Sequence, residues 1–383
     1  MKRVIVAIIL ILASISLYAK ESYYSAIINA SYLSDFAYNM LPVSLWGDFG
    51  VSGLDFFKGL DSKVYARLEA GLANRTVSQD PATGKILDDV EGNGYNVAFS
   101  DGSVVYEQGL LKDSGASFSL SFILRMRWEQ AFADFSDIRN GNYAGVFGKT
   151  SLFPSSDSGY LVGTPDLGGG KYMLSNSFNI KLSFNMLDDD YRTPEGFKVD
   201  ASILFAPWFF LNKLSAFNYT KTSCSKMDFS AAYKHTFSSD KDWWSDRNKY
   251  SLYIATYLDA SIFSGSAVPR YLMNNSFMGK RIPPRSVYMA LNSTLWLVGP
   301  EVLSKGTYPG AYVFFDNGFS AGRILNSGEG VGYDFLGGVG VGVDMHIFGL
   351  FRVFFEYQYV YTKIPGERTG SDFSFGGYLT VIL

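Results

Sequence analysis

The sequence predicts an all-β fold, a transmembrane antiparallel β-barrel of 14–16 strands, on three observations. Apolar and polar residues alternate at period two along many segments, as in strands that have two unlike faces. Aromatic residues make up 17% of the chain and charged residues only 18%, which excludes a disordered chain. The final segment, 371–383, reaches the chain end with an apolar face, and a barrel needs such a strand to pair with its first strand.

The N-terminus has the pattern of a secretory signal peptide. Lys2 and Arg3 precede an apolar stretch from Val4 to Leu17, and a cleavage point follows at Tyr18-Ala19. The stretch is too short to span a bilayer comfortably as a helix. We therefore expect residues 1–19 to direct Sec-type export. Residues 20–383 would then form the barrel in the bacterial outer membrane, in contact with its lipid.

The first seven segments show the alternation clearly. Between 62 and 73 the even positions are apolar, whereas Arg67 and Glu69 are among the odd ones. Between 115 and 129 the even positions are again apolar, and Arg125, Arg127 and Glu129 are odd. Stretches of this kind have the length that a tilted strand needs to cross the hydrocarbon layer. These segments lie near residues 22–33, 45–57, 62–73, 95–109, 115–129, 171–187 and 196–211.

The last seven segments follow the same rule. Valines alternate with glycines from Gly338 to Val343, and Val353 to Tyr361 alternate with polar residues. A large soluble β-sandwich also alternates. The regularity over so many segments, together with the signal peptide, favours the barrel. These segments lie near residues 222–238, 248–265, 286–298, 307–320, 332–347, 349–362 and 371–383.

Two long connections separate strands, one over residues 130–170 and one over residues 266–285. The first is rich in Gly, Ser, Asp and aromatic residues, and the second contains four cations and Pro283-Pro284. Long loops of outer-membrane barrels face the outside of the cell. Gly349 is expected to form a tight turn at the other end.

Signals for enzyme chemistry are weak. The two histidines, His235 and His346, offer little material for a metal site or a catalytic dyad. The Gly-rich stretch 337–342 lacks the Gly-Lys-Ser/Thr of a phosphate loop. We therefore expect no enzyme, no metal and no cofactor; the enzyme alternative is a lipase-type barrel, which the shortage of histidines argues against. The formal net charge of −3 does not suggest nucleic acid binding.

Charged residues of both signs are expected to face the lumen. A wide ion-selective pore often presents a ring of one sign. Mixed signs fit a lumen with internal ion pairs, or one filled by an inward-folded loop, and an ordinary water-filled interior remains an alternative. The expected lumen charges include Arg67, Glu69, Arg125, Arg127, Asp334, Asp344, Arg352 and Glu356.

The last third of the chain carries a family resemblance. Phe314, Asp316 and Gly318 form an aromatic-x-Asp-x-Gly pattern on a predicted strand, followed by the Gly-Val stretch 338–343 and by Phe351–Tyr357. This order resembles the C-terminal barrel strands of the BamA/TamA superfamily, also called bacterial surface antigens.

The resemblance implies that the loop before the last five strands folds into the lumen. In that family an Arg at the loop tip contacts the Asp of the aromatic-x-Asp-x-Gly strand. Here the loop contains Val268-Pro269-Arg270-Tyr271. We therefore expect a contact of Arg270 and Tyr271 with Phe314, Asp316 and Gly318. The resemblance also favours sixteen strands, and a barrel-only form without POTRA domains.

The leading hypothesis for function is an outer-membrane barrel of the BamA/TamA type, linked to outer-membrane biogenesis or surface display. Its own insertion would need the barrel-assembly machinery. The alternative is a passive or substrate-specific, porin-like channel, which the mixed-sign lumen motivates. A weaker third hypothesis is an adhesin that uses the 130–170 loop.

Overall fold

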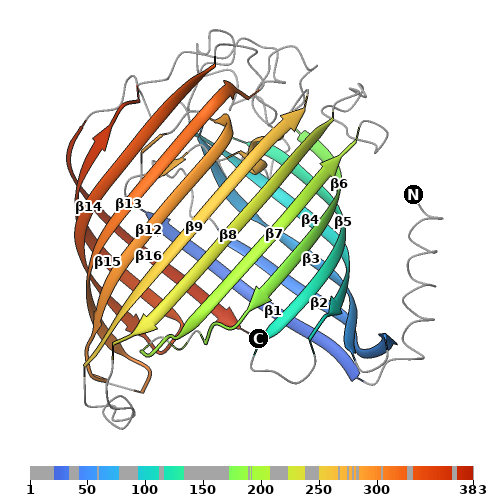
Figure 1. The fold of residues 1–383 in the computed structure, drawn as a ribbon, viewed down its shortest axis with the longest axis horizontal. Coiled ribbons are helices and arrows are strands. Elements are labelled where there is room, and N and C mark those ends of the chain that lie inside the picture. Colours follow the sequence, from blue (N-terminus) through green and yellow to red (C-terminus); the bar gives the residue numbers. More distant parts are fainter. Residues whose placement is uncertain are drawn as a thin grey trace.

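Fourteen antiparallel strands form one closed barrel in the described part of the chain (Figure 1). The strands are β1 (Glu21–Leu33), β2 (Val43–Phe57), β3 (Leu60–Thr76), β4 (Gly94–Gly109), β5 (Ser117–Phe132), β6 (Tyr172–Asn185), β7 (Gly196–Ala206), β8 (Cys224–Thr236), β9 (Ser251–Gly265), β12 (Arg285–Val298), β13 (Tyr308–Ile324), β14 (Gly332–Ile347), β15 (Phe351–Thr362) and β16 (Gly370–Ile382). The computed structural model describes residues 21–33, 43–57, 60–76, 94–111, 116–132, 172–188, 190, 192–207, 223–237, 250–265, 268–273, 276–277, 280–281, 284–302, 305–325, 331–364 and 369–382.

The barrel closes through its first and last strands. β1 pairs antiparallel with β16 from Ile27 opposite Ile382 to Leu33 opposite Gly376. Every barrel strand therefore has a partner on both sides, and the sheet has no free edge. A bilayer interior demands this arrangement, because it offers no water to satisfy unpaired backbone groups.

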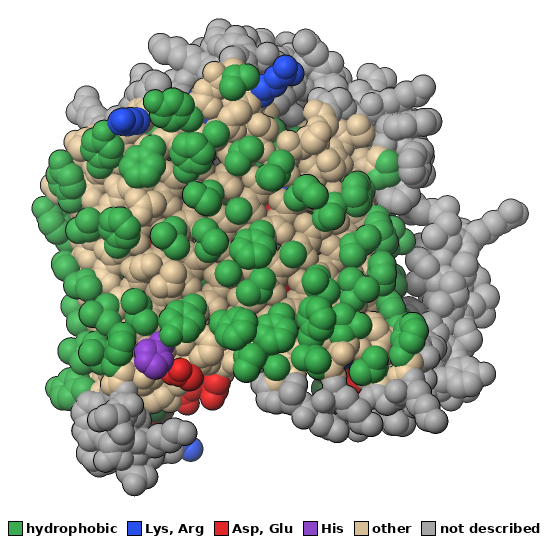
Figure 2. Space-filling view, in the orientation of Figure 1, with side chains coloured by type: hydrophobic (Ala, Val, Ile, Leu, Met, Phe, Trp, Pro, Cys, Tyr) green, Lys and Arg blue, Asp and Glu red, His purple; other side chains and the backbone are tan. Residues whose placement is uncertain are grey.

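The two faces of the wall follow from the period-two pattern. On β14, Val339, Val341 and Val343 point outward and are each more than half exposed, whereas the glycines between them are buried. Figure 2 shows apolar side chains spread over the outside of the strands, with charged ones near the two ends. An apolar outer face around a polar interior is what a barrel in lipid requires.

The connections differ between the two ends of the barrel. β14 and β15 meet at the lower end of Figure 1 through the short turn 348–350, in which Phe348 and Gly349 have positive φ angles of 56° and 70°. The C-terminus lies at the same end. At the upper end, β5 ends and β6 begins, and β9 ends and β12 begins. The predicted signal peptide, residues 1–19, and the 130–170 loop from residue 133 onward lie outside the described residues.

The strand number corrects one expectation. Sixteen strands, which the family resemblance favoured, is wrong, because the wall closes with fourteen. Each of the fourteen alternating segments overlaps one barrel strand, and closure leaves no edge to which more could add. The other two strands, β10 (Ser276–Phe277) and β11 (Lys280–Arg281), are two residues long and pair only with each other. Among the described residues, no helix is long and apolar enough to cross a bilayer.

Candidate functional site

The inner wall formed by β2, β3, β4 and β5 carries a set of ion pairs. Asp48 and Arg67 lie directly opposite each other on β2 and β3. The Arg67 guanidinium donates to both carboxylate oxygens of Asp48, from Nε at 2.7 Å and from Nη2 at 2.8 Å. The same guanidinium lies 4.7 Å from the centre of the Trp46 ring. This bidentate geometry is the strong form of an Arg–carboxylate pair.

Two arginines of β5 share one carboxylate of β4. Arg125 donates to Asp101, and Arg127 donates from Nη1 to Asp101 Oδ2 at 3.0 Å. Arg127 also donates to Glu129 Oε1, from Nη2 at 2.7 Å and from Nε at 2.9 Å. The side chains of Arg127 and Glu129 are only 7% and 0% exposed. Such a buried network holds because each charge has partners.

Residues 268–273, in the connection between β9 and β12, pack against the inner wall. Their 3-10 helix η1 (Arg270–Leu272) is flanked by buried residues. Val268, Leu272 and Met273 form an apolar cluster with Phe263 and with residues at the adjoining ends of β7 and β8. Leu204, Ala206 and Cys224 supply those ends. The segment therefore covers lumen-facing apolar side chains that would otherwise meet water.

Tyr271 extends from this segment to the charged wall. Its hydroxyl donates to Ser175 Oγ on β6 at 3.3 Å. Its ring lies 4.7 Å from the Arg127 guanidinium and 5.4 Å from that of Arg125. The Phe99 ring lies 4.3 Å from the same Arg127 guanidinium. Burial of the Tyr271 phenol raises its pKa, so the group stays a neutral hydrogen-bond donor.

The aromatic-x-Asp-x-Gly residues occupy the inner face of β13. The Phe314 ring lies against Gly340 of β14, where a Cβ atom would fall 2.3 Å from the ring. Asp316 lies opposite Asn292 of β12, and its Oδ1 is buried without a hydrogen-bond partner among the described residues. Gly318 lies opposite Leu336 of β14.

The structure does not bring Tyr271 to these residues. The contacts described for Tyr271 reach β5 and β6, which lie far round the wall from β13. The backbone of Arg270 begins η1, but its side chain lies outside the described residues. The contact of Arg270 with Asp316 therefore stays a prediction.

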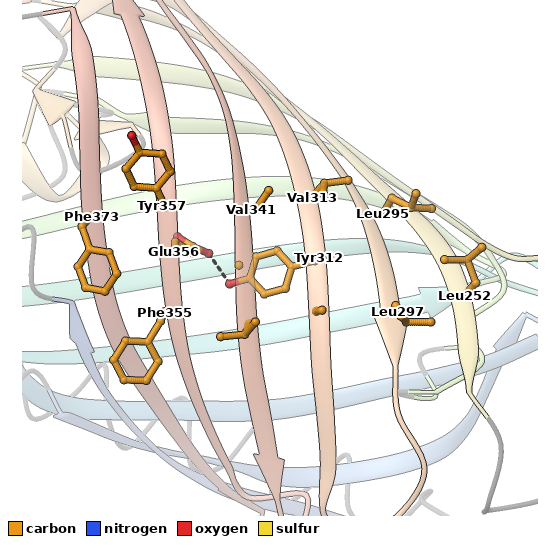
Figure 3. Close-up of a pocket in the computed structure, with 13 residues that line it drawn as sticks. Leu252, Leu295, Leu297, Tyr312, Val313, Val341, Phe355, Glu356, Tyr357 and Phe373 are labelled. Atoms are coloured by element: carbon orange, nitrogen blue, oxygen red, sulfur yellow. Dashed lines mark hydrogen bonds between the residues drawn. The ribbon is translucent and has the colours of Figure 1, made fainter.

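The other predicted lumen charges lie on β14 and β15 and have partners. Arg352 Nε donates to Asp344 Oδ2 at 2.7 Å. Asp334 accepts a hydrogen bond from Arg285 Nε. Glu356 accepts one from the Tyr312 hydroxyl at 2.6 Å, a bond that crosses over β14 (Figure 3).

Among the predicted charges, Glu69 stands apart. It has no hydrogen bond or ion pair within the described part of the chain. Its position on β3 places it on the inner face, opposite Trp46 on one side and Asp101 on the other.

Sequence reasoning missed several partners of the predicted charges. Asp48, Asp101 and Tyr312 were not among the expected site residues, although the segments that contain them were recognised. The alternation of even and odd positions along each strand would by itself have placed all three on the inner face. Only the strand register shows which arginine or carboxylate each one meets.

A further segment approaches the lumen at the lower end. Arg192 lies in the connection between β6 and β7 and is 8% exposed. Its guanidinium lies 5.4 Å from the Tyr308 ring, which belongs to β13 and packs against a buried cluster of Tyr253, Ala255 and Val298. Chain segments therefore contact the inner wall near both ends of the barrel.

Solved structures share this fold at low sequence identity. CdiB from Escherichia coli matches with a TM-score of 0.52 and 9% identity, over 94% of this chain and 63% of that one. BamA from Haemophilus ducreyi lacking POTRA domains 1–3 matches with a TM-score of 0.43 and 11% identity, over 94% of this chain and 71% of that one. CdiB from Acinetobacter baumannii matches with a TM-score of 0.45 and 9% identity, over 94% of this chain and 60% of that one.

The likeness to CdiB from Escherichia coli establishes the fold alone. The chain spans less than two thirds of the length of either CdiB protein. By sequence, it matches no protein-family model and no curated protein. The fold is that of outer-membrane β-barrel proteins.

Proposed function

We propose that this chain is an integral outer-membrane barrel of the BamA/TamA type, with a role in outer-membrane biogenesis or surface display rather than free passage of solutes. The observation that carries this proposal is the packing of Val268–Met273 onto the inner wall, with Tyr271 over Arg127. A segment held in this way occupies space that an open pore would leave to water.

Three further observations support the proposal. The apolar outer face supports a location in lipid, because charged groups there are costly near the bilayer midplane. The shared fold with CdiB from Escherichia coli extends over 94% of the chain. Asp316 faces inward, its buried Oδ1 has no hydrogen-bond partner among the described residues, and the proposal assigns that partner to Arg270.

Conductance in a planar bilayer tests the occupied lumen. We expect the purified chain to conduct weakly. The Tyr271→Ala variant should conduct more, because it loses the ring contacts to both arginines and the bond to Ser175. Phe373→Ala is the matched control, since that ring is exposed on the outer face. A large steady conductance of the unaltered chain would contradict the proposal.

The biogenesis role needs a test in cells. Depleting the chain should lower the amounts of other barrels, or of displayed proteins, in the outer membrane. Unchanged amounts after depletion, with the chain itself absent from the membrane fraction, would rule this role out.

A substrate-specific channel is the second candidate. The ion-paired inner wall of both signs favours it, because such a wall can bind polar solutes without excluding ions of one sign. A steady conductance that a defined solute blocks would support this function over the first.

A further inference from the structure

A pocket of about 450 Å³ lies on the inner wall where the barrel closes. Its side chains come from both ends of the chain, with Asn29 on β1 and Thr380 on β16. These two residues and Ser44 of β2 lie in one cross-strand row that continues through Gly71 to Phe99. Gly71 has no side chain, and the Phe99 ring occupies the space over it: a Cβ atom at Gly71 would lie 3.0 Å from Cζ of Phe99.

Glu69 places a negative charge in this pocket. Its half-buried carboxylate has no hydrogen bond or ion pair among the residues that the structure describes. Arg127 also lines the pocket, but it is paired with Asp101 and Glu129, and Arg67 is paired with Asp48. Arg125 interacts electrostatically with Glu69, but its guanidinium is hydrogen-bonded to Asp101.

The remaining groups of the pocket suit a small cation with polar substituents. Tyr378 is 44% exposed and stacks one face of its ring on Phe354, which leaves the opposite face and the hydroxyl for a ligand. The face of an aromatic ring attracts an organic cation through its quadrupole. The Thr380 hydroxyl donates to Asn29 Oδ1 at 3.2 Å, which leaves the amide N–H groups of Asn29 able to donate to a ligand. Anionic ligands are disfavoured, because Glu69 would repel them and the arginines already have carboxylate partners.

We propose that this pocket is a binding site for a small organic cation, a primary ammonium on a hydroxyl-bearing body, with Glu69 as its charge partner. Ser44, Tyr378 and Thr380 bind the polar body. Because β1 and β16 both contribute, the complete site exists only in the closed barrel. The site is independent of the role in biogenesis, and either could be absent without the other.

Ligand-observed saturation-transfer NMR on the full-length barrel in detergent tests the proposal. The probes are ethanolamine and its uncharged counterpart, ethylene glycol. We expect transfer to ethanolamine only, and at least a tenfold loss of its affinity in Glu69→Gln. The control Glu107→Gln removes another lumen carboxylate, which lies 4.0 Å from Lys63 and outside the pocket, and should bind as the unaltered chain does.

Three results would overturn the proposal: equal transfer to both probes, unchanged binding in Glu69→Gln, or equal losses in the two carboxylate variants. Heat-modifiable gel migration checks that each variant folds. If Glu69→Gln does not fold, Tyr378→Leu removes the aromatic ring and its hydroxyl and must weaken ethanolamine binding. As a second readout, ethanolamine should raise the thermal unfolding midpoint of the unaltered chain, because a ligand that binds only the closed barrel stabilises it.

Discussion

The two halves of the inner wall use different chemistry to fill the space beside the strands. On β2 to β5, cross-strand pairs of arginine and carboxylate line the wall. On β12 to β15, aromatic rings lie over glycines: Tyr312 covers Gly342, and Phe314 covers Gly340. The charged half depends on every partner being present, whereas the aromatic half depends on the absence of side chains at two positions.

Both parts of the wall are compatible with a polar lumen, but for different physical reasons. A buried charge is costly unless paired, so the arginine wall is arranged as a network. A ring packed on glycine buries apolar surface and keeps only its hydroxyl for polar contact, as Tyr312 does with Glu356. Arg352 belongs to both patterns, since it pairs with Asp344 and lies 4.8 Å from the Trp296 ring.

The largest effect is expected from Arg127→Met in the charged half. The change leaves the buried Glu129 and Asp101 with fewer partners, and should lower the free energy of unfolding by about 3 kcal/mol. Urea unfolding in lipid or detergent measures it. Adding Glu129→Met should recover part of the loss. Lys198→Met is the control, because it removes the 40% exposed lysine of the Lys198–Asp200 pair. It should lower the free energy of unfolding by less than about 1 kcal/mol. Equal losses of unfolding free energy in the two single variants would contradict the expected difference between buried and exposed ion pairs.

In the aromatic half, Gly342→Ala is expected to cost about 1–3 kcal/mol, as overpacking does. The new Cβ would lie 2.3 Å from Cζ of Tyr312, whose hydroxyl is held by Glu356. The same unfolding measurement applies. Gly370→Ala is the matched control, because nothing lies within 4 Å of its Cβ position. Tyr312→Leu combined with Gly342→Ala should show less than the sum of the single losses, and strict additivity would refute the packing explanation.

The smallest effect is expected from the exposed pair of Glu195 and His235 at the lower rim, which belongs to neither of these two parts of the wall. Glu195 accepts hydrogen bonds from the Thr236 N–H at 3.0 Å and from His235 at 2.9 Å. Burial opposes ionisation, but these bonds outweigh it and lower the pKa of Glu195. A lowered folded pKa stabilises the chain above the unfolded value of about 4.3, and this stabilisation disappears as pH falls through the folded pKa.

Glu195→Gln should therefore weaken the chain slightly at neutral pH and make no difference well below pH 4. The loss should stay under about 1 kcal/mol, because the carboxylate is 56% exposed. Thermal unfolding at several pH values measures it. A larger loss in acid than at neutral pH would contradict the assignment.

Much of the wall was predictable because side chains alternate strictly along a strand. The alternation predicted a shared inner face for six charged residues, and their ion pairs are consistent with that placement. These residues are Arg67, Arg125, Arg127, Asp344, Arg352 and Glu356. The resemblance added two strands that no alternating segment supported, and the closed fourteen-stranded wall excludes them. The local pattern was a better guide to strand number than the analogy.

The sequence by itself determined that this chain forms many two-faced strands with an apolar outside and a charged inside, because period two is a property of the local backbone. The tertiary structure decided which charges meet, since register and closure set every cross-strand neighbour. It placed Tyr271 over Arg127, while Glu69 has no ion-pair partner among the described residues. It also joined residues 29 and 380 in one pocket, because only barrel closure brings the two ends of the chain together.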